Sequence, residues 1–144
     1  MRHSLIRRSK RSSTMLKDLF KVTSEKGDLT ALNKIEQFDA KRMFYVTGVP
    51  KGSIRGYHAH KRDKQILICV KGAIKVTLDT GASPSEYYLE EGKAIFMDTL
   101  VWGTQEYMTG DDILLVLCSE EHDPDEYITS YFHFLHIVKG NMNE

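Results

Sequence analysis

The sequence is short of several features that mark particular classes of protein. It has no run of about 18 apolar residues that could span a membrane. It has no Gly-x-Gly-x-x-Gly or phosphate-binding loop, and its N-terminus lacks the apolar segment of a secretory signal peptide. A length of 144 residues suits a single core. We therefore expect a soluble, cytoplasmic protein with no membrane partner.

Acidic residues outnumber basic ones outside the first fourteen residues. That tail carries five cations and no acid: Arg2, Arg7, Arg8, Lys10 and Arg11. Because the formal net charge of the chain is zero, the remainder has a net charge of minus five. An acidic body without a basic stripe argues against a nucleic-acid partner. We expect a disordered tail at 1–14, with a nucleic-acid arm or a targeting segment as alternatives, and one domain at 15–144.

Cysteine is rare, with only Cys69 and Cys118 in the chain. Both lie in apolar runs typical of strands, where a free cysteine behaves as a small hydrophobic residue. A disulfide between them is compatible with the sequence, but we expect both thiols to be free and the compartment to be reducing.

Runs of residues with high β propensity recur at short intervals between turn signals. The expected strands are 16–23, 29–36, 42–47, 54–60, 65–70, 73–79, 86–89, 94–97, 101–107 and 112–118. After Asp123, a candidate N-cap, and Pro124, residues 125–134 are expected to form a short helix. This pattern predicts an all-β sandwich or barrel with one short C-terminal helix.

The most informative motif is Gly-x5-His-x-His-x4-Gln-x6-Gly. It runs through Gly52, His58, His60, Gln65 and Gly72. Two histidines separated by one residue on a strand point to the same face, because side chains alternate with a period of two. The motif therefore predicts a small β-barrel with both imidazoles directed into one cavity.

This spacing resembles the first motif of cupins, which form a double-stranded β-helix, or jelly-roll barrel. A second cupin motif would begin at Gly92 and place Gly103 where metal-binding members have a histidine. The resemblance would make His58, His60, Gln65 and Gly103 the metal ligands. Because glycine has no side chain and glutamine is a weak ligand, we expect no metal and disfavour a metal-dependent cupin dioxygenase or epimerase.

The stretch from Arg55 to Lys61, Arg-Gly-Tyr-His-Ala-His-Lys, resembles the signature of the WxcM-like sugar nucleotide 3,4-ketoisomerases. Similar segments recur across about 15–135, at 41–45, 65–72, 101–102, 114–119 and 125–128. The resemblance implies an isomerase without cofactors that converts a dTDP-4-keto-6-deoxyhexose to its 3-keto isomer in deoxysugar and polysaccharide (O-antigen) biosynthesis. It also implies a homodimer built by exchange of N-terminal strands.

The same resemblance suggests roles for individual residues. His58 is implied to be the catalytic base, and His60 a second acid or base, or an orienting partner. The resemblance also implies that Tyr45, Arg55 or Lys61 stabilises the charge of the enolate or binds the pyrophosphate. Two further candidates, named for contacts with the substrate, have alternatives: Gln65 could instead orient a histidine, and Trp102 could belong to the core.

Strand alternation leaves the direction of Arg55 open. Regular pleating places Arg55 and Tyr57 on the face opposite His58 and His60. A β-bulge at Gly56 would shift the phase and bring Arg55 to the histidine face.

At three positions the chain departs from the family pattern. Phe44-Tyr45 stands where members usually have two tyrosines, Lys26-Gly27 where they have Arg-Gly, and Gly103-Thr104 where they have His-Glu. The alternative function is a sugar-nucleotide-binding cupin that does not catalyse turnover, or an accessory subunit in a polysaccharide pathway.

Overall fold

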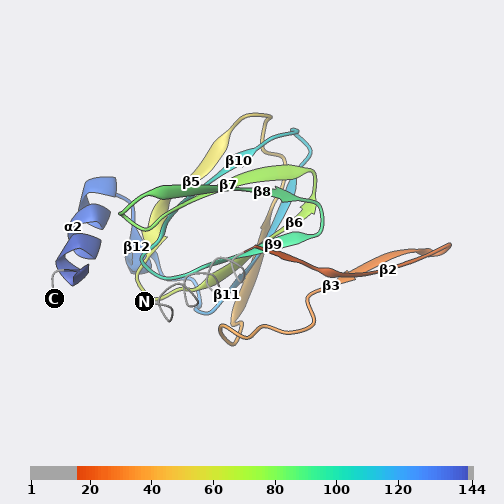
Figure 1. Ribbon diagram of the computed structural model, residues 1–144, viewed down its shortest axis with the longest axis horizontal. Helices are drawn as coiled ribbons and strands as arrows, with labels where there is room; N and C mark the ends of the chain where they lie inside the picture. The colour runs from red at the N-terminus through yellow and green to blue at the C-terminus, as the bar shows by residue number, and fades with distance from the viewer. Residues whose placement is uncertain (1–15, 143–144) are drawn as a thin grey trace, which may run out of the picture.

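The computed structural model describes residues 16–142, which form two five-stranded antiparallel sheets and a separate hairpin (Figure 1). The first sheet contains, in spatial order, β1 (Leu16–Asp18), β9 (Lys93–Met97), β6 (Gln65–Lys71), β11 (Ile113–Cys118) and β4 (Arg42–Val46). The second contains β12 (Tyr127–Ile128), β5 (Ile54–His60), β10 (Trp102–Tyr107), β7 (Ala73–Asp79) and β8 (Pro84–Glu90). The hairpin is β2 (Phe20–Ser24) and β3 (Gly27–Ala31).

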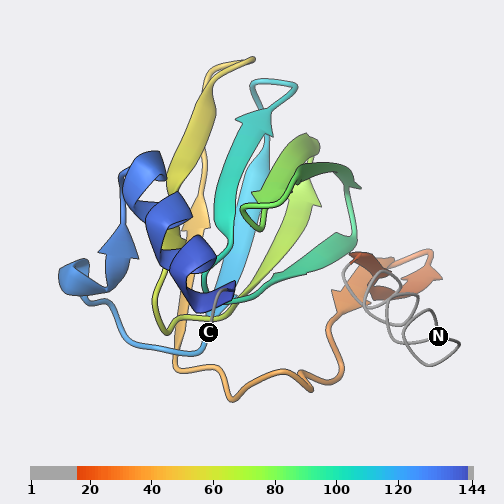
Figure 2. The ribbon, with the colours of Figure 1, turned by 60° about the vertical axis from the view of Figure 1, so that its left-hand side comes forward.

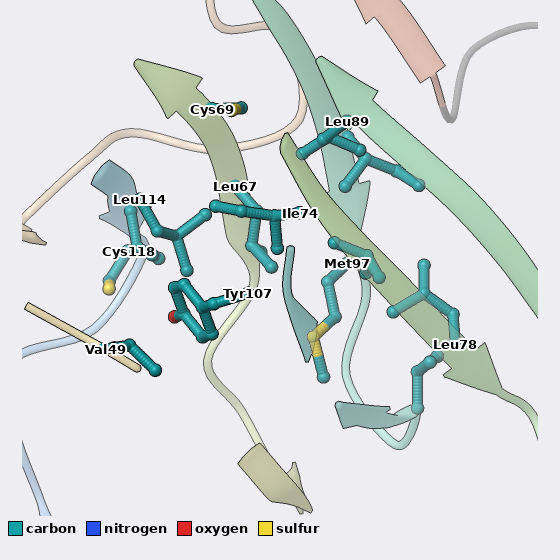
Figure 3. Packing of buried hydrophobic residues seen from close by; sticks show 14 residues of the cluster. Val49, Leu67, Cys69, Ile74, Leu78, Leu89, Met97, Tyr107, Leu114 and Cys118 are labelled. Carbon is teal, nitrogen blue, oxygen red and sulfur yellow. The ribbon is translucent and has the colours of Figure 1, made fainter. Parts of the chain in front are cut away.

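The apolar core lies between the two sheets. Inward-facing positions alternate along the strands, as in β11, where Leu114, Val116 and Cys118 are buried and the residues between them are only partly buried. Figure 3 shows side chains from both sheets, among them Leu67 and Ile74, meeting in this cluster. The two-sheet architecture predicted from the strand pattern is confirmed.

The outer face of each sheet is covered in part by a further segment. Residues 32–38 lie on the first sheet, so Ile66 and Ile68 of β6 are buried although they point away from the central core. Helix α2 (Tyr131–Met142) covers the second sheet at β5 and β12 (Figure 2). There Phe134 packs against Trp102, with ring centroids 5.8 Å apart.

Near the N-terminus the strands differ from the expected ranges. The predicted strand 16–23 is interrupted at Leu19, because 16–18 pairs with β9 while 20–24 pairs with β3 in the hairpin. Leu19 itself packs on the outer face of the first sheet. The predicted strand 29–36 ends at Ala31, and the chain then follows the sheet surface without strand pairing.

The predicted C-terminal helix is confirmed, but it spans Tyr131–Met142, whereas 125–134 was expected. Asp123 does act as an N-cap and accepts a hydrogen bond from the Asp125 amide, but only over a single 3-10 turn, η1 (Pro124–Glu126). The next two residues form β12 against β5, which buries Ile128. The helix begins after Ser130, whose hydroxyl accepts a hydrogen bond from the His133 amide at 3.2 Å.

Three further predictions concern the two cysteines, membrane-spanning helices and the N-terminal tail. Cys69 and Cys118 are both free and buried. Among residues 16–142, no helix has the length and apolar character needed to span a membrane. The predicted disordered tail at 1–14 lies outside the described residues.

Candidate functional site

A β-bulge in β5 sets the direction of the site residues. In the pairing with β10, His58 lies opposite Gly103 and Gly56 opposite Thr104, which leaves Tyr57 as the extra residue. Gly56 and Tyr57 have φ of 105° and 58°. A Cβ on Gly56 would lie 2.6 Å from the Gly103 carbonyl oxygen, so only glycine fits there. The bulge turns Tyr57 outward, and Arg55 and His58 line the same cavity.

This cavity, of about 230 Å³, lies between the sheets. Its polar lining consists of Arg55, His58, Gln65, Gln105, Tyr107 and Tyr127. Its apolar lining includes Phe44, Val46, Leu67, Leu114 and Val116. Polar and apolar residues thus contribute about equally to the wall, and such convergent polar groups can orient a bound small molecule.

The protonation of His58 follows from its backbone contact. Its Nδ1 lies 3.0 Å from the carbonyl oxygen of Gly56, and a carbonyl can only accept a hydrogen bond. Nδ1 therefore carries the hydrogen, and in the neutral ring Nε2 has the free lone pair. Burial, aided by the neighbouring His60, lowers the pKa of His58. The ring is thus neutral at pH 7 and its Nε2 can accept a proton.

His60 lies deeper and is bound by carboxylates. Its Nδ1 donates to Glu126 Oε2 at 3.3 Å and lies 4.0 Å from Asp63 Oδ2. Burial lowers the pKa of His60, although Glu126 and Asp63 act in the opposite direction. Its Nε2 is buried without a hydrogen-bond partner among the described residues. The His58 and His60 rings meet edge to face, with centroids 4.8 Å apart.

A buried network of charges holds this end of β5. Glu126 Oε1 accepts hydrogen bonds from the backbone amides of Arg62 (2.5 Å) and Asp63 (2.6 Å). Asp63 Oδ2 in turn lies 3.5 Å from the Arg42 guanidinium and accepts a hydrogen bond from Gln65 Nε2 at 2.9 Å. Each charged group therefore has a partner, as buried ionic groups require.

Tyr127 completes the wall beside the histidines. In β12 it pairs directly with His60 of β5. Its ring centroid lies 5.0 Å from that of His58 and 4.7 Å from that of His60. Tyr127 and Glu126 were not among the residues predicted for the site, because the sequence placed both in a helix.

Three of the five residues predicted to bind the substrate lie outside the cavity. Tyr45 is 64% exposed on the outer face of β4, with Phe44 turned inward in its place. Lys61 is exposed beyond the end of β5. Trp102 packs against Tyr131 and Phe134 at α2, the core alternative noted for it above. None of these three lines the cavity, whereas Arg55 and Gln65 do; their roles in binding stay predictions.

The residues present do not fit the metal of metal-binding cupins. Gly103 faces His58 but provides no ligand, and a Cβ there would lie 2.7 Å from Met97 Cε. The Met97 side chain thus fills the space that a histidine would need. Across residues 16–142 no group of three or more His, Cys, Asp or Glu side chains is arranged to hold a metal ion.

Comparison with known proteins assigns the family. Residues 12–139 match the family model described as "FdtA: WxcM-like, C-terminal". The chain belongs to this WxcM-like family. This confirms the resemblance found in the sequence.

Relatives of this WxcM-like protein include characterised enzymes. It is 31% identical over 128 residues to the TDP-4-oxo-6-deoxy-alpha-D-glucose-3,4-oxoisomerase of Aneurinibacillus thermoaerophilus, covering 86% of this chain and 92% of that enzyme. The sugar 3,4-ketoisomerase QdtA of Thermoanaerobacterium thermosaccharolyticum, solved with TDP, superposes with a TM-score of 0.81 at 32% identity, over 88% of this chain and 94% of QdtA.

Further solved structures extend the similarity. A mutant of QdtA in complex with TDP-4-keto-6-deoxyglucose gives a TM-score of 0.82 at 31% identity, over 90% of this chain and 96% of that one. WlaRA, a TDP-fucose-3,4-ketoisomerase from Campylobacter jejuni, gives 0.79 at 27% identity, over 88% and 96% of the two chains. The superposition on QdtA confirms the predicted cupin-like fold.

Proposed function

We propose that this chain is a sugar-nucleotide 3,4-ketoisomerase that converts a TDP-linked 4-keto-6-deoxyhexose to its 3-keto isomer. The observation that carries the proposal is a neutral His58 whose Nε2 is free in a cavity formed by the bulge at Gly56. The A. thermoaerophilus relative catalyses this class of reaction, and QdtA has been solved with TDP and, as a mutant, with TDP-4-keto-6-deoxyglucose.

In the proposed reaction, His58 Nε2 removes the proton on C3. The electrons of the C3–H bond form a C3–C4 double bond, and those of the C4 carbonyl move to its oxygen, which gives an enediolate. A proton is then delivered to C4, the O3 hydroxyl proton passes to O4, and the C3 carbonyl forms, which leaves O4 as the hydroxyl of the product. Proton transfers by a positioned histidine contribute ~10²–10⁴-fold to such a rate.

Supporting roles follow from position. We propose that His60, held by Glu126, returns the proton or orients His58, and that Gln65, fixed by Asp63, contacts the sugar. Arg55 is the only permanent cation among the described residues that line the cavity, and we propose that it binds the pyrophosphate of the substrate.

We also propose that no metal takes part in the reaction. Prolonged treatment with a chelator is therefore expected to leave turnover unchanged, and activity that requires added metal would contradict this.

The proposal is tested by incubating the protein with TDP-4-keto-6-deoxyglucose and following the products by NMR, while calorimetry measures the binding of TDP. Formation of the 3-keto isomer is expected. Binding of TDP and of the substrate without conversion would instead support the alternative of a non-catalytic sugar-nucleotide-binding cupin. Failure to bind either compound would contradict both functions.

We also propose that the protein is a homodimer. β1 pairs with β9 of its own chain, so hairpin β2–β3 is the element available to a partner. In Figure 1 this hairpin projects from the barrel, and Phe20, Val22 and Leu29 on it are 53%, 48% and 60% exposed. Light scattering at micromolar concentration should give the mass of a dimer, and a monomeric mass would contradict the proposal.

We further propose that the protein is located in the cytoplasm. The proposed nucleotide-sugar substrate and the two free thiols support this location.

A further inference from the structure

Tyr127 is the hydroxyl-bearing side chain that contacts both histidines. Its place is fixed by the pairing of β12 with β5, in which Tyr127 lies opposite His60. Side chains of directly paired residues lie on the same face of a sheet, so the phenol leans over the imidazoles and into the cavity.

Arg42 determines how the phenol can act. The Arg42 guanidinium lies 3.1 Å from His122 Nδ1 and 3.4 Å from Cys118 Sγ. It also interacts with the Tyr127 hydroxyl, which helps to raise the pKa of Arg42. Burial disfavours the charge on Arg42, but hydrogen bonds with Cys118 and Tyr127 more than offset this, and the pKa of Arg42 is raised. A guanidinium has only donors, so the Tyr127 oxygen accepts from it. The phenol hydrogen is then free to be donated to another group.

No other phenol of the cavity is as close to the histidines. Tyr107 lies four residues beyond Gly103 on β10, and Gly103 is the residue opposite His58. At ~3.3 Å per residue, this places Tyr107 about 13 Å along the strand from the His58 position. Phe44, which has no hydroxyl, lines the cavity and lies under Arg42, with its ring centroid 5.2 Å from Cζ.

We propose that Tyr127 is a catalytic residue that donates a hydrogen bond to the enediolate oxygen of the bound sugar, the function that Phe44 cannot perform. The inference rests on the proposed isomerase function. Tyr127 transfers no proton overall: it lowers the energy of the negative oxygen formed when His58 removes the C3 proton. Arg42 is a positioning residue that bonds to the phenol oxygen and leaves the phenol hydrogen available to the substrate.

The test compares the wild type with Tyr127→Phe, which keeps the aromatic ring and removes only the hydroxyl. Tyr57→Phe is the matched control, because Tyr57 is in the same strand as the histidines but 53% exposed and outside the cavity. Turnover of TDP-4-keto-6-deoxyglucose, binding of TDP and thermal unfolding are measured for all three proteins.

Tyr127→Phe is expected to lower kcat by ~10²-fold, the usual effect of losing one oxyanion donor, with binding of TDP and the unfolding temperature unchanged. Tyr57→Phe should match the wild type. An active wild type with Tyr127→Phe turning over at the same rate would overturn this inference and leave the isomerase proposal intact. A wild type that binds the substrate without converting it would overturn both.

Discussion

The two ends of the barrel interior are built from the same strands but serve different purposes. On β6, Gln65 at one end bonds to Asp63 beside the histidines, whereas Cys69 at the other end lies in the apolar cluster with Ile74 and Leu89 (Figure 3). Burial, to which the nearby negative charge of Asp112 adds, raises the pKa of Cys69 to about 12, so this thiol is inert. Side chains of the apolar end fill space, whereas those of the polar end have partners that orient them.

This difference predicts that substitutions at the two ends affect different properties. At the polar end, removal of a functional group should reduce the rate more than the stability. At the apolar end, removal of volume should reduce the stability and leave the chemistry of the folded protein unchanged.

The largest effect is expected for His58→Asn. Loss of the proposed general base should lower kcat by ~10²-fold or more, while the free energy of unfolding and the proposed binding of TDP change little. Steady-state kinetics and calorimetry provide the check. His136→Asn, at an exposed position of α2, is the control and should behave as the wild type. If His58→Asn kept most of its activity, the base would have to be another residue.

The next effect is expected for Ile74→Ala at the apolar end. Ile74 is fully buried, and its truncation should lower the free energy of unfolding by about 2–5 kcal/mol. At a temperature where the variant is folded, kcat should stay within a factor of about two, since the apolar end makes no contact with the reacting groups. Denaturant titration and kinetics on the same preparation measure both. A loss of kcat as large as that of His58→Asn would refute the separation of the two ends.

A smaller loss of stability is expected for Gly56→Ala, which tests the bulge. A Cβ there meets the Gly103 carbonyl oxygen and the backbone has φ of 105°. Such strain should cost roughly 1–3 kcal/mol and, by shifting β5, should also reduce turnover. Gly52→Ala is the control, because Gly52 also has positive φ but nothing lies within 4 Å of its Cβ position. Equal losses in the two variants would show that the bulge has no special role.

The smallest expected effect is a shift in the pH dependence of kcat/KM. His58 must be unprotonated to act as a base, and its pKa is lowered from 6.5 by burial and by His60. We expect kcat/KM to rise with pH through a value below 6.5 and to be constant near neutrality. In His60→Asn the contribution of His60 is lost, so the apparent pKa should move upward. A downward or absent shift in the pH profile of this variant would show that His60 does not influence the base.

Much of this architecture could be predicted from the sequence. Alternating apolar residues gave the strands of the barrel. The spacing of His58 and His60 correctly brought the two rings together, but only His58 lines the cavity into which both were expected to point. The direction of Arg55 stayed open, because a bulge depends on the close approach of Gly56 and Gly103, which belong to different strands. Local sequence does not report such a contact.

The residues that were missed lie where tertiary contacts overrode local preference. The helix signals at Asp123 and Pro124 are real, but burial of Ile128 and the bonds of Glu126 draw the next residues into a strand beside β5. Tyr127 reaches the histidines only as a result. The capping side chain of Ser130 was the local signal that could have placed the start of the helix correctly.

The central claim, proton abstraction from C3 by His58, is tested most directly with substrate deuterated at C3 in ordinary water. The account predicts that deuterium is lost to solvent during turnover, that the 3-keto product carries hydrogen at C4, and that both processes slow together in His58→Asn. Quantitative transfer of the deuterium from C3 to C4, unaffected by His58→Asn, would indicate a hydride shift and contradict the account.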